Sequence, residues 1–208
     1  MKMVFTFVLV LVVHFSSVAQ AQDWIELFSG KDLSGWKVSE NPTSFAVENG
    51  LLKVAGPRAH AFYVGDVGGA DFKNFELLVE VKTLPKANSG IFIHTAYQET
   101  DWPEKGYEVQ VNQSHSDWRK SGSLYAVNDV SEVHVKDGEW YTYHLIVNGD
   151  QLSVALNGKV VMEYDESLDT KRAVPLGKKR FDRGTIALQA HDPESVIYFR
   201  SVKIKLLD

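Results

Sequence analysis

The 208-residue chain contains no cysteine, and this absence removes several kinds of site at once. A chain without thiols forms no disulfide, binds no metal through thiolates and has no cysteine nucleophile. It also lacks the cysteine that carries the lipid of a bacterial lipoprotein. Any chemistry that the protein performs must therefore come from oxygen and nitrogen groups.

An excess of positive charge is also lacking. The sequence has 22 lysine and arginine residues against 27 aspartate and glutamate residues, which gives a formal net charge of −5. Proteins that bind nucleic acids usually carry a basic patch, so we expect no nucleic-acid partner. With 44% hydrophobic residues, a chain of this length is typical of one globular domain.

A long apolar run occurs in the first segment alone. Lys2 precedes the run Val4–Val13, and Ala19-Gln20-Ala21 has the small-x-small pattern of a cleavage site. The run is short for a membrane span, which takes roughly 20 residues. We therefore predict that residues 1–21 are a cleaved signal peptide. The mature chain, 22–208, is expected to have no membrane span and to be periplasmic or secreted.

The mature sequence has no convincing amphipathic helix of ten residues or more. Glycine, asparagine and aspartate recur at strand-length intervals, and Asn49-Gly50, Asn148-Gly149 and Asn157-Gly158 are typical hairpin turns. We predict strands at residues 24–28, 75–82, 88–95, 106–112, 120–127, 140–147, 151–156, 159–164, 184–191 and 196–206, two short strands within 45–54, and a loop at 165–182. This pattern indicates an all-β, single-domain antiparallel β-sandwich whose first and last strands meet in one sheet.

The stretch 88–127 is more polar than a core and more regular than a loop. Side chains alternate across a strand, so Tyr107, Val109 and Val111 share one face of their strand. The opposite face carries Glu108, Gln110 and Asn112. Such a row of hydrogen-bonding groups is either the solvent-exposed face of an ordinary sheet or a surface that binds a polar ligand.

Segments spread over nearly the whole mature chain resemble the 3-keto-disaccharide hydrolase domain family, in the family's order. They are Leu27–Trp36, Asn88–Ile93, Tyr107–Val111, Gly122–Tyr125, Trp140–Tyr143, Leu156–Gly158, Gly184–His191 and Phe199-Arg200. The resemblance implies a jelly-roll sandwich of the concanavalin type. It also implies an exported enzyme that cleaves glycosides already oxidised to a ketone at C3. The chain departs from the family at His94, where an arginine is frequent, and at Ala126, where a glycine is frequent.

The residues favour elimination over ordinary glycoside hydrolysis. A retaining glycosidase needs two carboxylates about 5 Å apart, but Glu108 is followed on its strand face by the amides of Gln110 and Asn112. A 3-keto sugar needs less, because the ketone acidifies the proton on C2 and places the C1 oxygen β to the carbonyl. One base, one acid and donors to the enolate oxygen suffice.

The candidate residues fall into two groups. The catalytic candidates, which can exchange protons, are Glu108, His191 and His94. The substrate-binding candidates are Gln110, Asn112, Lys120, Tyr125, Gln189 and Trp118, of which Gln110, Gln189 and Lys120 could donate to the enolate oxygen and Tyr125 and Trp118 could contact the sugar. Trp102 is a second loop tryptophan of the kind that often forms a sugar platform.

No cofactor or metal is predicted. His94, Glu108 and His191 could surround an ion, but no local ligand spacing such as His-Glu-x-x-His supports this. His60, His115, His134 and His144 have no patterned partner, and we expect them to be structural or exposed. The expected partner is a carbohydrate, namely an oxidised disaccharide or glycoside. The sequence does not determine the oligomeric state.

Two other functions remain open at this point. The same fold and polar face would suit a non-catalytic carbohydrate-binding module, although such modules usually occur in one chain with an enzyme domain. A structural or adhesion-type sandwich is the third possibility, in which the face with Glu108 would be ordinary surface.

Overall fold

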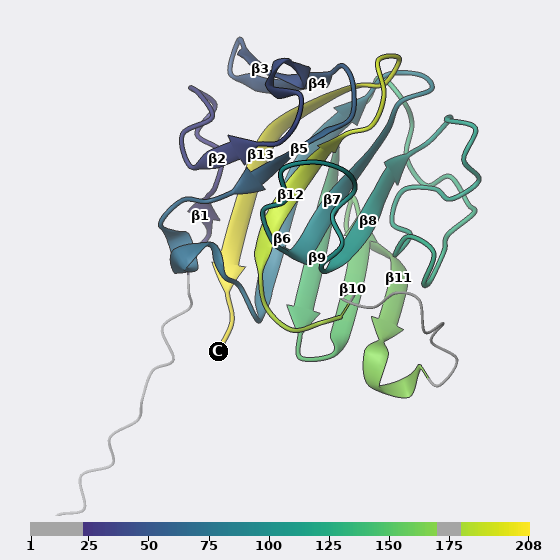
Figure 1. Cartoon of the computed structure of the whole chain (residues 1–208). Coiled ribbons are helices and arrows are strands. Elements are labelled where there is room, and N and C mark those ends of the chain that lie inside the picture. Colours follow the sequence, from purple (N-terminus) through teal and green to yellow (C-terminus); the bar gives the residue numbers. More distant parts are fainter. Residues whose placement is uncertain (1–22, 170–179) are drawn as a thin grey trace, which may run out of the picture.

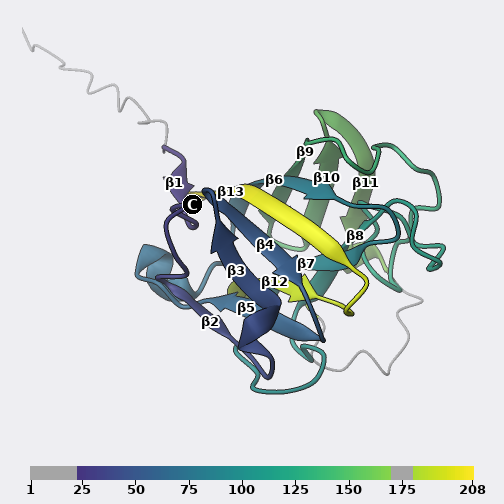
Figure 2. The same ribbon diagram turned by 90° about the horizontal axis from the view of Figure 1, so that it is seen from above.

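The computed structural model describes residues 23–169 and 180–208, which form two antiparallel sheets packed face to face (Figures 1 and 2). The larger sheet has the strand order β11 (Lys159–Asp165), β10 (Gln151–Leu156), β9 (Tyr141–Asn148), β6 (Phe75–Thr83), β13 (Val196–Leu206), β4 (Leu51–Ala55) and β3 (Phe45–Glu48), with β1 (Ile25–Glu26) beside β13. The smaller sheet runs β2 (Trp36–Val38), β5 (Ala59–Tyr63), β12 (Thr185–Ala190), β7 (Asn88–Thr95) and β8 (Tyr107–Asn112). The predicted all-β sandwich is confirmed.

Several local predictions are confirmed as well. The strands at the two ends meet, because Ile25 of β1 pairs with Ile204 of β13. The three Asn-Gly turns close the hairpins β3–β4, β9–β10 and β10–β11. At two of them the asparagine itself has a positive φ, 52° at Asn49 and 48° at Asn157, which is the geometry that makes this dipeptide a hairpin signal.

The predicted strand at 120–127 is wrong. Gly122 and Ala126 have φ of 95° and 60°, which interrupts an extended backbone. The segment is instead an irregular cover on β8, held by backbone hydrogen bonds from Ser121 to Asn112 and from Tyr125 to Glu108. It occupies the free edge of the smaller sheet and fixes Tyr125 beside Glu108.

Strand β5 was not predicted, and the 165–182 region is in part a short helix. His60 and the neighbouring alanines gave residues 59–63 no clear apolar alternation. The predicted loop begins with the 3-10 helix η3 (Glu166–Leu168), and residues 170–179 lie outside the described part of the chain. Two further 3-10 turns are η1 (Pro42–Ser44) and η2 (Val67–Ala70).

The core lies between the sheets and follows the alternation of the strands. On β6, Phe75, Leu77, Val79 and Val81 are fully buried while the residues between them are partly exposed. Burying each such side chain contributes about 1.5–3 kcal/mol. Among the described residues, no helix is long and apolar enough to cross a bilayer.

The smaller sheet differs because its central strands are buried on both faces. Every residue of β7, β8 and β12 is buried, including the polar ones. The outer face of this sheet is crossed by the loop 96–106, drawn in teal in front of β12 and β7 in Figure 1. Polar side chains on this face are therefore enclosed without belonging to the core.

Candidate active site

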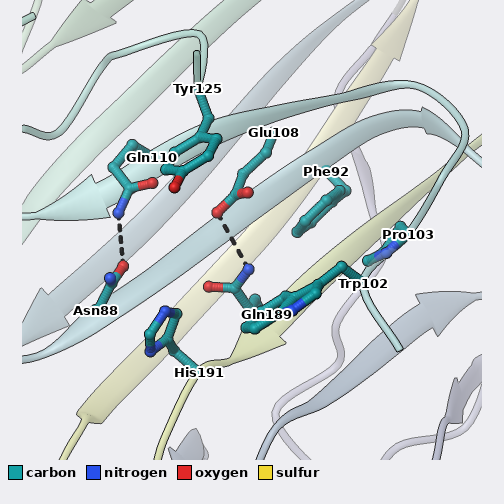
Figure 3. A pocket seen from close by; sticks show the side chains of 9 residues that line it. All are labelled: Asn88, Phe92, Trp102, Pro103, Glu108, Gln110, Tyr125, Gln189 and His191. Carbon is teal, nitrogen blue, oxygen red and sulfur yellow. Dashed lines mark hydrogen bonds between the residues drawn. The ribbon is translucent and has the colours of Figure 1, made fainter. Parts of the chain in front are cut away.

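A hollow of about 190 Å³ lies on the outer face of the smaller sheet, beneath the loop 96–106 (Figure 3). Its lining comes from three strands and the segments that cover them. The lining residues are Asn88, Phe92, Trp102, Pro103, Glu108, Gln110, Tyr125, Gln189 and His191. Five of the predicted site residues are thus brought together from distant parts of the sequence.

The absence of a side chain at Gly90 creates room for the carboxylate of Glu108. Gly90 pairs with Gln110 across β7 and β8, and Phe92 pairs with Glu108. A Cβ atom at position 90 would lie 2.4 Å from Oε1 of Glu108. The same oxygen accepts a hydrogen bond of 3.1 Å from Nε2 of Gln189 on β12. The carboxylate therefore lies over the middle of the sheet.

His191 is held in one tautomer by its neighbour in sequence. Its Nδ1 lies 2.7 Å from Oδ2 of Asp192, an oxygen that also accepts from Oγ of Ser195. Burial raises the pKa of Asp192, but the hydrogen bonds from His191 and Ser195 outweigh it, and the pKa is lowered overall. Because an ionised carboxylate only accepts, Nδ1 carries the proton, and Nε2 of neutral His191 is basic.

Tyr125 supplies a hydroxyl group that stays protonated. Burial, together with the charge of Asp117, raises the pKa of the Tyr125 phenol despite the guanidinium of Arg119. That guanidinium stacks 4.6 Å from the centre of the ring. Tyr125 can therefore donate a hydrogen bond to an oxygen in the hollow.

Trp102 forms the rim of the hollow. Its indole lies 5.4 Å from the ring of His191 and is 41% exposed. The loop that carries it is pinned by Arg58, which donates to Asp101 at 2.9 Å and to Glu40 at 2.9 Å. An indole with one face near the hollow and its edge in solvent is suited to stack on a sugar ring.

His60 lies beneath this loop. Its ring is fully buried, 5.7 Å from the indole of Trp102 and 5.2 Å from the ring of Phe92. Among the described residues neither of its ring nitrogens has a hydrogen-bond partner. Burial lowers its pKa to about 4, so the ring is neutral at ordinary pH.

Three of the predicted substrate-binding residues lie outside the hollow. Asn112 is directed to the following loop, where Nδ2 donates to the carbonyls of Asp117 and Arg119. The ammonium of Lys120 donates to the carbonyls of His115 and Asp117 in the same loop. Trp118 is 54% exposed and is not part of the lining. The first two side chains therefore brace the loop 113–121.

His94 is placed in the interior and not in the hollow. Its Nε2 donates to the carbonyl of Lys73 at 2.8 Å, and its Nδ1 accepts from the amide of Asp182 at 3.2 Å. Burial lowers its pKa, so it stays neutral. Its ring packs against Phe75 and Phe181. These contacts connect the end of β7 to two neighbouring segments and separate His94 from Glu108 and His191.

Several residues at the site were not predicted from the sequence. Asn88 and Phe92 share the outer face of β7 with Gly90, and the period of two that identified Gln110 would have found them. His115 and Asp192 adjoin His191. The His-Asp pair in the turn after β12 was the available signal for Asp192. The position of His115 depends on how the loop 113–121 folds.

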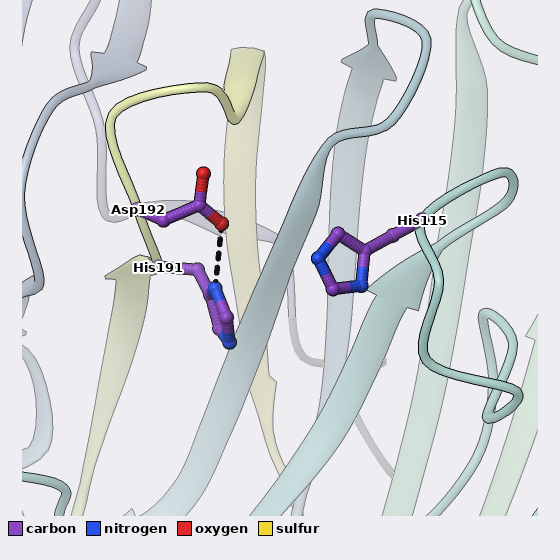
Figure 4. A group of neighbouring side chains, drawn as sticks. All are labelled: His115, His191 and Asp192. Carbon is purple, nitrogen blue, oxygen red and sulfur yellow. Dashed lines mark hydrogen bonds and ion pairs between the residues drawn. The ribbon is translucent and has the colours of Figure 1, made fainter.

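His115, His191 and Asp192 form a cluster whose potential ligand atoms lie within 4.8 Å of one another (Figure 4). Nδ1 of His115 accepts from the amide of Asp117 at 3.1 Å. Its Nε2 then carries the proton in the neutral ring. Oδ1 of Asp192 accepts from the amides of Glu194 and Ser195. Because Nδ1 of His115 and both oxygens of Asp192 already accept hydrogen bonds, the cluster fits the orientation of His191 better than the coordination of an ion.

Comparisons with known proteins show which sequences and folds the chain is similar to. A 3-keto-disaccharide hydrolase of Bacteroides thetaiotaomicron is 26% identical over 234 residues, covering 90% of this chain and 80% of that protein. The crystal structure of a candidate glycosyl hydrolase from Parabacteroides distasonis is similar with a TM-score of 0.75 and 25% identity, covering 89% of this chain and 94% of that one. An endo-beta-1,3(4)-glucanase of family GH16 shares the fold, with a TM-score of 0.56, 15% identity and coverage of 92% and 96%.

The expected family is confirmed by a match that extends over nearly the whole described domain. The description of the matching family is a 3-keto-alpha-glucoside-1,2-lyase-like domain, and the match runs from residue 23 to residue 205. It includes all the strands of both sheets except the last residue of β13. The chain therefore belongs to the 3-keto-alpha-glucoside-1,2-lyase-like domain family.

Proposed function

We propose that this protein is an exported enzyme that cleaves the glycosidic bond of 3-keto glycosides by elimination followed by addition of water. The observation that carries the proposal is that Glu108 and His191, from β8 and the end of β12, line one hollow in a chain of this family. A carboxylate and an imidazole are the side chains that most often act as general acid or base. The hollow is of a size that suits a single sugar ring.

The proposed reaction begins at C2 of the oxidised sugar. Nε2 of His191 removes the C2 proton, and the hydroxyl of Tyr125 donates to the enolate oxygen that forms at C3. The bond between C1 and the glycosidic oxygen then breaks, and the leaving oxygen takes the proton from the imidazolium. Glu108 then takes a proton from a water molecule as its oxygen adds to C1 of the C1–C2 double bond, and the protonated Glu108 returns that proton to C2, which completes a net hydrolysis.

A second hollow of about 550 Å³ is proposed to receive the leaving sugar. It adjoins the first at Asp192 and His115, whose ring lies 5.6 Å from that of His191. Most of its lining residues have polar side chains, and they are Lys86, Ser114, His115, Ser116, Asp192, Pro193 and Glu194. A polar leaving group, such as a second sugar, fits this surface better than an aryl group does.

The test is cleavage of a glucoside and of its 3-keto form by the wild type and two variants. We expect the wild type to cleave only the 3-keto form. His191→Ala and Glu108→Gln should each lower kcat by about 10²–10⁴-fold, which is the usual contribution of a general acid or base. Rates near that of the wild type in both variants would contradict the proposal.

A carbohydrate-binding function without catalysis is the second candidate. The observation that favours it is the pair of buried amide oxygens of Gln110 and Gln189, which have no hydrogen-bond partner among the described residues. Equal binding of a plain and an oxidised glycoside, with cleavage of neither, would support this alternative over the enzyme.

A further inference from the structure

Two amide oxygens in the floor of the pocket carry an inference about which sugars it accepts. Oε1 of Gln110 and Oε1 of Gln189 belong to side chains that are each only 1% exposed. Within residues 23–169 and 180–208, neither oxygen has a hydrogen-bond partner. Buried polar atoms in folded proteins are nearly always satisfied, so a ligand that supplies donors is the natural partner for both.

The positions of the oxygen and the nitrogen in the Gln110 amide follow from a backbone N–H, because a backbone N–H can only donate. The N–H of Asp117 donates to Nδ1 of His115 at 3.1 Å, so this nitrogen carries a lone pair. Nδ2 of Asn88 faces the same nitrogen at 3.3 Å, which directs Oδ1 of Asn88 towards Gln110. Nε2 of Gln110 donates to that oxygen at 2.5 Å, as Figure 3 shows. The oxygen of the Gln110 amide is therefore left for a ligand.

The orientation of Gln189 is fixed by a carboxylate. Its Nε2 donates to Oε1 of Glu108 at 3.1 Å, because an ionised carboxylate can only accept. The oxygen of the Gln189 amide is then left over, as in Gln110. One N–H of each amide is thus used within the protein. The carbonyl oxygen of each amide, which can only accept, is the group that has no partner among the described residues.

We propose that the amide oxygens of Gln110 and Gln189 recognise hydroxyl groups that donate to them, and that the pocket floor therefore selects a neutral sugar with free hydroxyls over a uronate or a phosphorylated sugar. The floor presents three acceptors, namely the oxygens of Gln110 and Gln189 and the carboxylate of Glu108. An anionic group placed against them meets two amide oxygens and a carboxylate, and it has no hydrogen to donate to them. This inference rests on the proposed function, since it assumes that the pocket binds the oxidised sugar ring.

The test uses 3-keto glucosides changed at C4 or C6, which lie away from the atoms that react. Each position is tested as hydroxyl, deoxy and deoxyfluoro, and C6 also as a carboxylate. Fluorine accepts weakly but cannot donate. At one position or both, we expect the deoxy compound to lose about tenfold in kcat/KM, the cost of about 1.4 kcal/mol for a lost hydrogen bond. The fluoro compound should recover none of it, and the C6 carboxylate should lose more than tenfold.

Replacement of the two glutamines tests whether their amide oxygens cause the loss of kcat/KM in the deoxy compounds. Gln110→Met and Gln189→Met keep the length of the side chain and remove the acceptor, so each should reduce the difference between the hydroxyl and deoxy compounds. Gln151→Met is the matched control, because Gln151 is exposed on β10 in the other sheet and should leave the pattern unchanged.

The outcomes separate the two proposals. If the parent compound is bound but not cleaved, the proposed reaction is contradicted. The selectivity is then tested with dissociation constants, measured by calorimetry on the wild type with the same compounds. A fluoro compound that restores the affinity lost in its deoxy counterpart overturns the inference. Equal use of the carboxylate and the parent, absence of any loss in both deoxy compounds, or failure to bind any of the compounds also overturns it.

Discussion

Gly90 illustrates how one residue without a side chain can make a site. It stands in the middle of β7, and a Cβ atom there would lie 2.4 Å from Oε1 of Glu108. Gly90→Ala should displace the carboxylate and break its hydrogen bond to Gln189. We expect kcat/KM on a 3-keto glycoside to fall at least tenfold, because the carboxylate that moves is one of the two groups proposed to exchange protons in the reaction.

The same substitution should have little effect on the free energy of unfolding. The backbone of Gly90 is outside the left-handed region, and the three atoms that would clash, Oε1, Cδ and Cγ, all belong to the side chain of Glu108, which can turn away about its own torsions. Alanine is also favoured over glycine in a strand by about 0.5–1 kcal/mol. Thermal unfolding followed by circular dichroism measures this, and a large loss of stability with full specific activity would contradict the prediction.

Asp192 is predicted to act through His191 and not on the substrate. In Asp192→Asn the amide can place its N–H₂ against Nδ1, which would move the proton of the neutral imidazole to Nε2 and remove the basic lone pair from the hollow. We expect kcat to fall by about 10²-fold or more while KM changes little. A kcat close to that of the wild type, or a loss confined to KM, would show that Asp192 has no such role.

The loop 96–106 is the element on which the shape of the hollow depends. It places Trp102 over the outer face of the smaller sheet, and His60 lies under it without polar partners among the described residues. Burial lowers the pKa of His60 to about 4, against an ordinary value of 6.5. Protonation of this ring would therefore charge a buried site directly below the indole.

The pH dependence of stability follows from this shift. Above pH 6.5 the ring is neutral in both folded and unfolded chains, so the full stability is present. As the pH falls towards 4 the unfolded chain takes up a proton that the folded chain refuses, and stability is lost. A shift of this size corresponds to about 3 kcal/mol. His60→Leu should show a smaller drop in melting temperature between pH 7 and pH 4, and an equal drop in both proteins would contradict the assignment.

At the scale of the whole molecule, alternation in the sequence predicted the strands well, because one face of a strand packs in the core and the other faces the hollow or the solvent. Tyr107, Val109 and Val111 face the core, and Glu108 and Gln110 face the hollow, as their period of two indicates. Alternation also placed Asn112 on this face, but its side chain satisfies the carbonyls of a loop instead. The ammonium of Lys120, which was expected to donate to the substrate, does the same. The position of Trp102 could not be predicted from alternation, since it depends on how the loop 96–106 folds back over the sheet.

The ends of the described domain give a prediction about the whole chain. β1 joins β13 through the pairs Ile25–Ile204 and Glu26–Lys203, and the amide of Leu27 donates to Val202 at 2.8 Å. A chain that begins at Gln22, the predicted mature start, retains all these contacts and should have the full stability and activity. A chain that begins at Phe28 loses the pairs, and with each net hydrogen bond worth about 1 kcal/mol its free energy of unfolding should fall by about 2–4 kcal/mol.

The two truncated proteins are compared by denaturant unfolding, with turnover of a 3-keto glycoside as the second measurement. Because β1 is remote from the hollow, the shorter chain should keep its kcat while it remains folded. Mass determination of the protein isolated from a bacterial host with its full leader tests the start itself. A mature chain that begins well beyond Gln22 would lack β1, and the predicted cleavage after Ala21 would then be wrong.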